Sequence, residues 1–412
     1  MTAANPSNPL TRARRQLLET VRAIDDWFYD GTRETRILFV FPDPYGFACQ
    51  TPIIPHLQAY ADVDVRVVWD RSGIRPNSAF ASARDEELYR SLHMDPLRAS
   101  LRKWHIVVYS HLCRFHPRRR ALRAYLHHGA GFGSGGGLAA ARAFEIYLGL
   151  SVAEKLFLEA RSSDLFEESR AFFPVGFPKA DVLLDGSSTR AAVLSQLKLP
   201  DRRTLLITSH YRPTSTLRSL GPRIFREIAA NFPHCNVIQT GHPWLWQETG
   251  DADDKWRRPL LTELNAIATQ YPNARLVTDM LAEPLAVASD LLIADYSSVV
   301  TTFGLLDRPI VFYANPAIEV RSTTAFQLYC DAAHVFSALD DTVEICRAAL
   351  KAPQAKIAGR KILREAFYAN AGTSAKVTAE VLRAIGPVCT VRSPRWQRIL
   401  ALSRAYCDGA QA

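Results

Sequence analysis

The chain has 412 residues, of which 48% are hydrophobic and 22% are charged, and its formal net charge is +9. This length predicts two domains, and the apolar content is sufficient for two cores without metal or disulfide staples. Seven scattered cysteines without a CxxC pair argue against a disulfide framework or a zinc site and favour a reducing cytosol.

The N-terminal residues 1–33 predict a polar tail followed by an amphipathic helix. Leu17, Val21, Ile24 and Trp27 recur at helical spacing with arginines between them. Such a helix would either pack on the first lobe or lie on an anionic membrane. We see no secretory signal and no membrane span, so we expect a cytoplasmic protein, in peripheral contact with the membrane if the helix binds lipid. The net charge favours anionic partners, and we expect no nucleic acid among them.

From Arg36 onward, apolar strand-like runs alternate with helical stretches, which predicts βαβ units and parallel sheets. In the first half we expect strands at 36–41, 64–69, 105–110 and 155–160. In the second half we expect strands at 204–209, 235–241, 274–279, 290–295 and 308–314, separated by helices. The tail after about residue 340 predicts helices.

This pattern predicts an α/β protein with two Rossmann-like, doubly wound domains that face a cleft, the GT-B-like architecture. We expect an acceptor-side domain at 34–190, a nucleotide-donor-binding domain at 200–385 and a C-terminal helix at 386–412. Ligands of open parallel sheets bind beyond the carboxyl ends of the strands, so polar residues that directly follow strands are the candidates for chemistry.

The first candidate is the run LHHGAGFGSGGG at residues 126–137, which follows an arginine-rich stretch without acids. A histidine such as His128 at a glycine-rich turn is typical of a general base, and the backbone at Gly129 can approach phosphate oxygens closely. The GxGxxG spacing at 131–136 lacks a clean preceding strand and a suitable downstream acid, so we reject a dinucleotide-binding fingerprint.

Two further candidates follow the first two strands of the second half. Ser209, His210 and Arg212, in the loop TSHYRP, are typical phosphate contacts, although ordinary loop polarity would look the same. His242 lies between Gly241 and Pro243, in a rigid turn at a strand end. This placement favours a catalytic role over that of a buried structural histidine.

The fourth candidate is ADYSS, in which Asp295 ends a strand while Ser297 and Ser298 open a helix. Serines at that position are good helix caps, and the free N–H groups there also suit an anion. We therefore assign Asp295, Ser297 and Ser298 to the donor phosphate site, together with Gly129, Ser209, His210 and Arg212.

Taken together, these motifs resemble the CDP-glycerol glycerophosphotransferase family of teichoic-acid and capsule synthesis. His128–Gly129 is similar to the HG pair of that family, VGFPKAD at 175–181 to its inter-lobe turn, and His242–Pro243 to its HP turn. The most specific part is Asp295–Ser298 followed by Asp307–Pro309. The chain departs from the family pattern at His127, at Lys179–Ala180, at Thr302 and in the segment after Gly129.

The resemblance implies transfer of glycerol phosphate, or a related alditol phosphate, from a CDP-linked donor to a hydroxyl of a lipid-linked or polymeric cell-surface glycan. It implies that His128 takes the proton of the attacking hydroxyl and that His242 stabilises charge on the transferred phosphate or the leaving CMP. No cofactor is expected, and the need for Mg²⁺ stays open, as do the donor's alditol and the oligomeric state.

Two alternatives remain open at this point. The same histidine and serine turns fit a nucleotide-sugar enzyme, either a GT-B glycosyltransferase or a relative of UDP-GlcNAc 2-epimerase. The changed residues after Gly129 also fit a non-catalytic nucleotide-binding partner.

Overall fold

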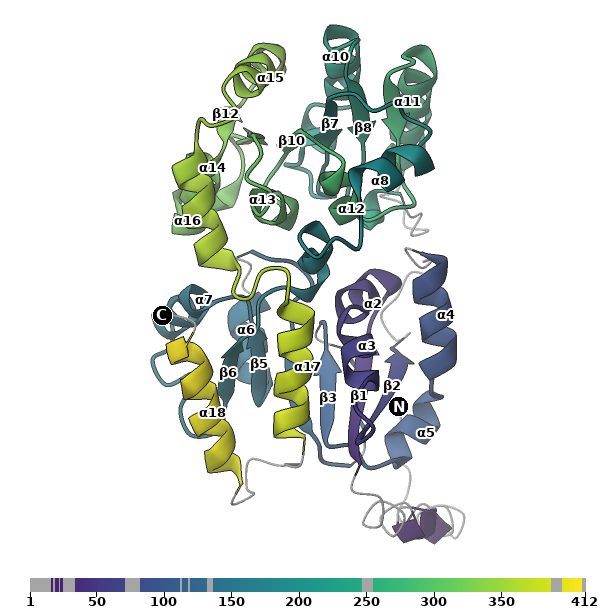
Figure 1. The fold of residues 1–412 in the computed structure, drawn as a ribbon, viewed down its shortest axis with the longest axis vertical. Helices are drawn as coiled ribbons and strands as arrows, with labels where there is room; N and C mark the ends of the chain where they lie inside the picture. Colours follow the sequence, from purple (N-terminus) through teal and green to yellow (C-terminus); the bar gives the residue numbers. More distant parts are fainter. Residues whose placement is uncertain are drawn as a thin grey trace.

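The computed structural model describes residues 16–17, 19–21, 23–24, 34–70, 82–111, 113–117, 119–131, 136–246, 255–386 and 395–409. They form two lobes, one above the other, each built on a six-stranded sheet (Figure 1). All the strand pairs are parallel. This is the two-lobed α/β architecture that the sequence predicts.

The sheet of the first lobe has the strand order β2-β1-β3-β4-β5-β6. Its strands are β1 (Thr35–Phe41), β2 (Val63–Trp69), β3 (Ile106–Tyr109), β4 (Leu122–Leu126), β5 (Ile146–Gly149) and β6 (Ala171–Pro174). Its helices are α2 (Pro44–Gln50), α3 (Ile53–Gln58), α4 (Ala83–Leu92), α5 (Pro96–Leu101), α6 (Gly136–Ala143) and α7 (Val152–Glu159). Every residue of β1 and β3 is buried, as the continuous apolar runs of a two-faced parallel sheet require.

The sheet of the second lobe has the order β12-β11-β10-β7-β8-β9. Its strands are β7 (Thr204–Ile207), β8 (Asn236–Gln239), β9 (Ala274–Leu276), β10 (Leu291–Ala294), β11 (Ile310–Tyr313) and β12 (His334–Phe336). Around it lie α8 (Arg190–Gln196), α9 (Thr216–Ser219), α10 (Arg223–Asn231), α11 (Arg257–Gln270), α12 (Ala282–Val287), α13 (Ser298–Gly304), α14 (Thr324–Ala332), α15 (Thr342–Lys351) and α16 (Ile357–Phe367).

The chain crosses between the lobes twice. The first crossing is the 3₁₀ turn η2 (Pro178–Leu183), and the second leads from α16 into α17 (Ser374–Ile385) and α18 (Trp396–Gly409), which lie on the first lobe (Figure 1). Ala379, Leu382 and Ile385 of α17 are buried in the same core as β1. We had expected residues up to 385 to belong to the second lobe. A helical pattern identifies an apolar face but not the sheet against which that face packs.

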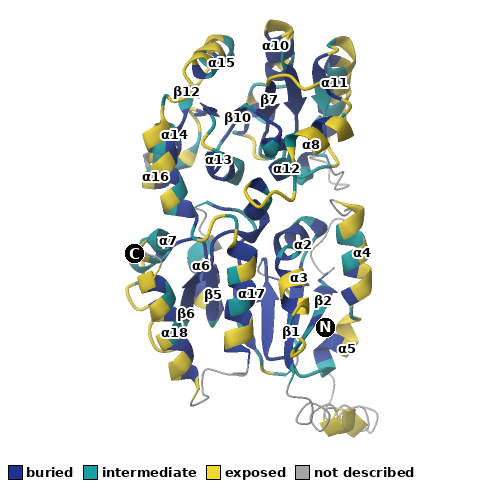
Figure 2. Cartoon of the chain, in the orientation of Figure 1, coloured by how far each residue is buried: buried dark blue, intermediate teal, exposed yellow. Residues whose placement is uncertain are grey.

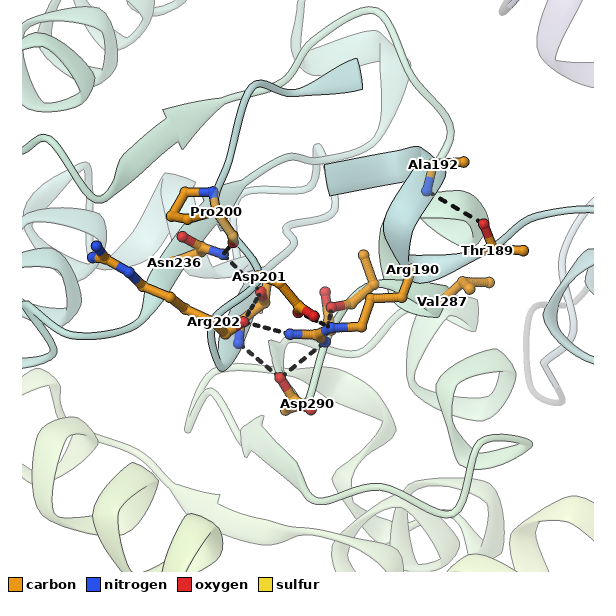
Figure 3. Close-up of polar contacts among 12 residues, drawn as sticks. Thr189, Arg190, Ala192, Pro200, Asp201, Arg202, Asn236, Val287 and Asp290 are labelled. Carbon is orange, nitrogen blue, oxygen red and sulfur yellow. Dashed lines mark hydrogen bonds and ion pairs between the residues drawn. The ribbon is translucent and has the colours of Figure 1, made fainter. Parts of the chain in front are cut away.

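A polar network around Arg190 holds the start of α8, which follows the first crossing, against the sheet of the second lobe (Figure 3). The guanidinium donates to Asp201, to Asp290 at 3.1 Å and to the carbonyl oxygens of Ala288 and Arg202. Asp290 also accepts from the backbone N–H of Thr204, the first residue of β7. This network lies at the amino ends of β7 and β10, the edge of the sheet opposite the carboxyl ends, and its role is therefore structural.

One expected strand is wrong. Residues 155–160 fall in helix α7, which Ser151 caps by accepting a hydrogen bond from the backbone N–H of Glu154. The segment is rich in Leu and Phe and holds no β-branched residue, so a short apolar run could not distinguish helix from strand. The sheet continues instead through β4, β5 and β6, none of which was expected, and β4 is the strand that we found lacking before the glycine-rich run.

The described residues between 16 and 24 are helical, whereas the rest of the expected N-terminal tail and helix lies outside the described residues. Leu17 and Ile24 expose 65% and 51% of their surface, so they do not pack on the first lobe. Figure 2 draws the described turns of this helix in the colour of exposed residues. In α18, by contrast, Trp396, Ile399 and Leu400 are buried against the first lobe. Within the described part of the chain, no helix is both long and apolar enough to cross a membrane.

Candidate functional site

The candidate residues lie at the switch point of each sheet, where consecutive strands add on opposite sides. In the first lobe this point lies between β1 and β3, and in the second it lies between β7 and β10. In the first lobe, Tyr45 lies at the start of α2, directly after β1, and His111 lies in the loop after β3. In the second lobe, His210 and Asp295 lie in the loops after β7 and β10. Since ligands of open α/β sheets bind outside the carboxyl ends of strands at such points, the fold itself points to this region.

His128 follows β4 and is half-buried, with its ring held from two directions. Its Nδ1 lies 3.1 Å from the carbonyl oxygen of Ser110, and its face stacks on the ring of His111 with 3.6 Å between the centroids. Burial lowers the pKa of His128 well below its usual value, and the neighbouring His111 and His127 lower it further. The ring is therefore neutral at pH 7. Because the carbonyl can only accept, Nδ1 carries the proton and Nε2 keeps its lone pair.

The adjacent His127 has a different environment. Its Nε2 lies 2.8 Å from the carboxylate of Glu154 and 3.1 Å from the hydroxyl of Tyr147, inside the first lobe. Neighbouring residues of an extended segment point to opposite sides, so only one of two consecutive histidines can reach the cleft. The residue that departs from the family pattern thus packs inward, while the His128 ring lies on the other side, against His111 and the Ser110 carbonyl.

His242 opens the 3₁₀ turn η3 (Pro243–Leu245) after β8, in the second lobe. Its Nδ1 accepts a hydrogen bond of 3.2 Å from the backbone N–H of Trp244. Burial lowers the pKa of His242 well below its usual value, and the charges of His210 and Lys179 act in the same direction. The neutral ring therefore keeps its proton on Nε2, the opposite tautomer to that of His128. Its ring lies 5.4 Å from that of Tyr45 in the first lobe, so the two lobes meet here.

The loop after β7 is organised around Asp295. The carboxylate accepts hydrogen bonds from the Ser209 hydroxyl at 3.0 Å, from the backbone N–H of His210 at 3.1 Å, and from the N–H and hydroxyl of Thr216. Ser209 and Asp295 expose 1% and 2% of their surface. Burial raises the pKa of Asp295, and these hydrogen bonds oppose the rise. Both residues are thus engaged with each other and with the loop that presents His210.

His210 itself lies beside the other rings of the second lobe. Its centroid is 5.2 Å from that of His242 and 4.3 Å from that of Tyr211, on which it stacks. Burial and the nearby Arg212 lower the pKa of His210 to about 4. Its Nδ1 accepts from the backbone N–H of Arg212 at 3.3 Å, so Nε2–H is the group left to donate. The side chain of Arg212 is exposed.

Ser298 meets Gly129 across the two lobes. A Cβ built on Gly129 would lie only 3.1 Å from the Ser298 hydroxyl, so a glycine allows the closest approach here. Ser297 and Ser298 stand at the start of α13, and the buried Oγ of Ser297 has no hydrogen-bond partner among the described residues. Thr302, at the family's acidic position, points inward and contacts the Tyr368 hydroxyl at 2.9 Å.

The sequence reasoning missed a cluster at the crossing between the lobes. Lys179 in η2 is buried, pairs with Glu283 of α12 at 2.9 Å, and holds its Nζ 4.1 Å from the ring centroid of Tyr45. Burial alone would lower the pKa of Lys179, but Glu283, Tyr45 and Cys49 together raise it above its usual value. Lys179 is therefore a fixed positive charge next to His128 and His242, whose pKa values it lowers.

Other parts of the expected site lie elsewhere. Residues 132–135 of the glycine-rich loop are outside the described residues. Arg123, from the arginine-rich approach, forms an ion pair of 2.6 Å with Glu145 within the first lobe. In the described ranges no group of three or more His, Cys, Asp or Glu side chains is arranged to hold a metal ion.

The sequence of the second lobe matches a family model. Residues 258–378 match the model described as CDP-glycerol:poly(glycerophosphate) glycerophosphotransferase. Both Asp295–Ser298 and Asp307–Pro309 lie within this segment, whereas His128 and His242 lie before it. No curated protein matches the chain.

Solved structures match the fold over nearly the whole chain. A structure of the wall teichoic acid polymerase TagF is 14% identical, with a TM-score of 0.59, and the match covers 94% of this chain and 99% of that one. A TagF structure soaked with CDPG matches with a TM-score of 0.58 at 14% identity, over 92% and 99% of the chains.

A putative UDP-N-acetylglucosamine 2-epimerase from Listeria monocytogenes is 13% identical, with a TM-score of 0.55 and coverage of 86% and 98%. These likenesses confirm the GT-B-like, two-lobed fold. Together with the family match over residues 258–378, they confirm that the chain resembles the CDP-glycerol glycerophosphotransferase family.

Proposed function

We propose that the chain transfers glycerol phosphate, or a related alditol phosphate, from a CDP-linked donor to a hydroxyl of a lipid-linked or polymeric glycan acceptor. The observation that carries the proposal is the pair of neutral histidines with opposite tautomers. His128 presents a lone pair on Nε2 from the first lobe, and His242 presents an N–H on Nε2 from the second. When a phosphoryl group moves from one oxygen atom to another, one group must accept the proton of the attacking hydroxyl. A second group must donate a hydrogen bond where negative charge develops.

In the proposed reaction, the acceptor hydroxyl attacks the phosphorus that bears the alditol, and its proton passes to Nε2 of His128. A phosphodiester bond forms to the acceptor oxygen, and the bond between the two phosphates breaks. CMP leaves with the bridging oxygen and its electron pair. His242 donates its Nε2–H to an oxygen of the transferred or leaving phosphate, where negative charge develops.

The remaining candidates would hold the donor. Ser298 and the unpartnered hydroxyl of Ser297 offer donors to phosphate oxygens from the start of α13. His210 offers its Nε2–H, Gly129 lets the backbone approach, and Arg212 supplies a positive charge at the rim. Ser209 and Asp295 position His210 rather than touch the donor. Catalysis of this kind rests on positioning and charge stabilisation, without a covalent intermediate.

The first test is donor binding by calorimetry with CDP-glycerol, CDP-ribitol, CMP, UDP-GlcNAc and UDP. We expect a CDP-alditol to bind most tightly and Ser298→Ala to weaken it by roughly ten-fold, the loss of one charge-assisted hydrogen bond. The matched control is Ser91→Ala, because Ser91 is exposed on α4 in the first lobe. A preference for a uridine nucleotide would replace this proposal with a nucleotide-sugar enzyme.

The second test is transfer itself, followed as CMP release in the presence of a lipid-linked acceptor analogue. Removal of a general base or of a transition-state donor costs roughly 10²–10⁴-fold, so His128→Gln and His242→Gln should each lose activity on that scale. The exposed His234 is the control, and His234→Gln should retain full activity. Donor binding without transfer in the wild-type protein would favour a non-catalytic partner.

The acceptor is proposed to be reached at a membrane surface. The N-terminal helix exposes Leu17, Val21 and Ile24 in a segment rich in arginine, as expected of a helix that lies on anionic lipid. Sedimentation with vesicles should show binding to anionic but not to neutral lipid, weakened by salt and by Leu17→Asp. Equal binding to anionic and neutral vesicles, or no binding to either, would contradict the proposed membrane contact.

A further inference from the structure

His111 and His128 form a face-to-face pair at the edge of the first sheet. Their centroids lie 3.6 Å apart and their planes differ by 26°. His111 follows β3 and His128 follows β4, and these two strands pair in parallel, so both loops leave the sheet at the same edge. Ser110, next to His111, supplies the carbonyl that accepts from His128 Nδ1. Both contacts to the His128 ring therefore come from one two-residue segment.

His111 has no other evident task in the fold. It is half-buried, and its buried Nδ1 finds no hydrogen-bond partner among the described residues. By contrast His105, which precedes β3, accepts a backbone hydrogen bond, and His127 pairs with Glu154. The imidazole of His111 is half-buried and packs flat on the candidate base His128. Its position is better explained by an effect on the orientation and protonation of His128 than by a contribution to the stability of the lobe.

We propose that His111 is a positioning residue for the transfer, which fixes the ring plane of His128 so that its Nε2 faces the acceptor hydroxyl. This inference rests on the proposed function and deepens it. The stack and the Ser110 carbonyl leave the His128 ring no freedom to turn about χ2. A base held in its reactive orientation contributes to the rate without any contact between His111 and substrate.

The pair also affects the charge of the base. Burial is the main cause that lowers the pKa of His128, His111, His127 and Lys179 lower it further, and the hydrogen bond to the Ser110 carbonyl opposes them. Cys49 of α2 also lies close, with its thiol 3.5 Å from the His128 carbonyl oxygen. On His111, burial lowers the pKa, while the negative charge of Asp43 opposes this effect. His111 nevertheless lowers the pKa of His128, and an uncharged ring in its place removes that effect.

The test uses two variants with different consequences. His111→Phe keeps a flat ring on His128 but cannot be charged, so the acid limb of the kcat/KM–pH profile should move to higher pH while the alkaline plateau stays near that of the wild type. His111→Ala removes the stack, so kcat should fall roughly ten-fold with little change in the KM for the donor. The matched control is His116→Phe, because His116 lies in the same loop and its Nδ1 lies 3.0 Å from the Tyr109 hydroxyl.

A second readout does not require transfer. The ring resonance of His128, assigned by its loss in His128→Gln, is followed through a pH titration of the full chain labelled at histidine. We expect the resonance to titrate at higher pH in His111→Phe than in the wild type and to titrate as in the wild type in His116→Phe. An unchanged titration in His111→Phe would remove the electrostatic coupling of the two rings, and an unchanged kcat in His111→Ala would overturn the positioning role. If the titration shifts while the wild type transfers nothing, the proposed function fails but the coupling of the two rings stands.

Discussion

The hydroxyl of Thr301 in the second lobe donates a hydrogen bond of 2.7 Å to the carbonyl oxygen of Ala130 in the first. Thr301 is fully buried and also contacts the Tyr368 hydroxyl at 3.0 Å. Because Ala130 follows His128–Gly129 and Thr301 lies one helical turn after Ser297–Ser298, this bond sets the register between the candidate base and the serines. The closed arrangement of the two lobes thus depends on local contacts at the site.

The contact between Gly129 and Ser298 leads to a first prediction. Gly129→Ala places a methyl group 3.1 Å from the Ser298 hydroxyl, which must then move away from the donor. We expect donor binding to weaken by roughly ten-fold, and the effect to shrink in the Ser298→Ala background, with a coupling of about 1 kcal/mol. Calorimetric titration of the four proteins of the cycle measures this coupling.

The matched control is Gly137→Ala in α6, where the added methyl group would meet its nearest neighbour only at 3.8 Å. This variant should bind donor as the wild type does. If the losses of donor-binding free energy in Gly129→Ala and Ser298→Ala were strictly additive, the two positions would act separately. That result would contradict the contact between Gly129 and Ser298.

A second prediction concerns the buried carboxylate of Asp295. Asp295→Ala would leave the buried backbone N–H groups of His210 and Thr216, and the Thr216 hydroxyl, without their acceptor. We expect the free energy of unfolding to fall by about 3 kcal/mol and donor affinity to fall with it, because the loop of His210 loses its anchor. Urea denaturation followed by circular dichroism measures the loss.

The exposed Asp340 provides the comparison, since Asp340→Ala should change the free energy of unfolding by less than about 0.5 kcal/mol. If Asp295→Ala left stability intact but abolished donor binding, Asp295 would contact the donor directly, as the sequence motif alone suggests.

The motifs that could be recognised from the sequence are those that a single segment defines. Asp295–Ser298 and His242–Pro243 each combine a strand end, a turn and a helix start within a few residues, so composition and order suffice to place them. His111 and Tyr45 also follow strands, directly or within a few residues, and the same rule could have found them. His111 was passed over because the stretch from 105 to 121 is rich in arginine and histidine and shows no helix after its strand.

Contacts between the lobes could not be inferred in the same way. The sequence analysis identified Lys179 only as a departure from the family pattern in a turn and gave Glu283 no role. Their pairing depends on how η2 crosses to α12, and no periodicity in either segment encodes that crossing. The packing of α17 on the first lobe could not be inferred either. The apolar face of this helix could pack on either core, and the sequence does not show which path the chain takes.

The pair of Lys179 and Glu283 leads to a third prediction. Each side chain exposes only 5% of its surface, so Lys179→Met or Glu283→Gln alone leaves the other group without its partner and should cost about 3–5 kcal/mol of unfolding free energy. The double variant should be more stable than either single variant, since no buried charge remains unpaired. Thermal and urea unfolding of all four proteins complete the cycle.

The double variant also distinguishes a role of the pair in stability from a role of the Lys179 charge in transfer. If it folds stably but transfers poorly, the positive charge of Lys179 acts on the site; the acid limb of the pH profile should then move upward, because Lys179 lowers the pKa of His128. Full activity in the double variant would limit the pair to holding the lobes together.

The last prediction uses His105, which precedes β3, away from the cleft. It is buried, its Nδ1 accepts from the backbone N–H of Arg36 at 2.9 Å, and burial lowers its pKa to about 4. Between its ordinary pKa near 6.5 and about 4, the unfolded chain binds a proton at this residue and the folded chain does not. Stability is therefore complete above pH 6.5 and is lost as the pH falls through this window, by about 3 kcal/mol in total.

The variant His105→Asn keeps an acceptor oxygen close to the position of Nδ1 but cannot titrate. The difference in unfolding free energy between wild type and variant should be constant above about pH 7. As the pH is lowered to 4, the wild type should lose stability relative to the variant. Urea unfolding at several pH values measures this difference, and His234→Asn, at an exposed position, should give a flat one. A flat difference for His105→Asn as well would mean that His105 is protonated in the fold, and the hydrogen bond from Arg36 would then have no acceptor.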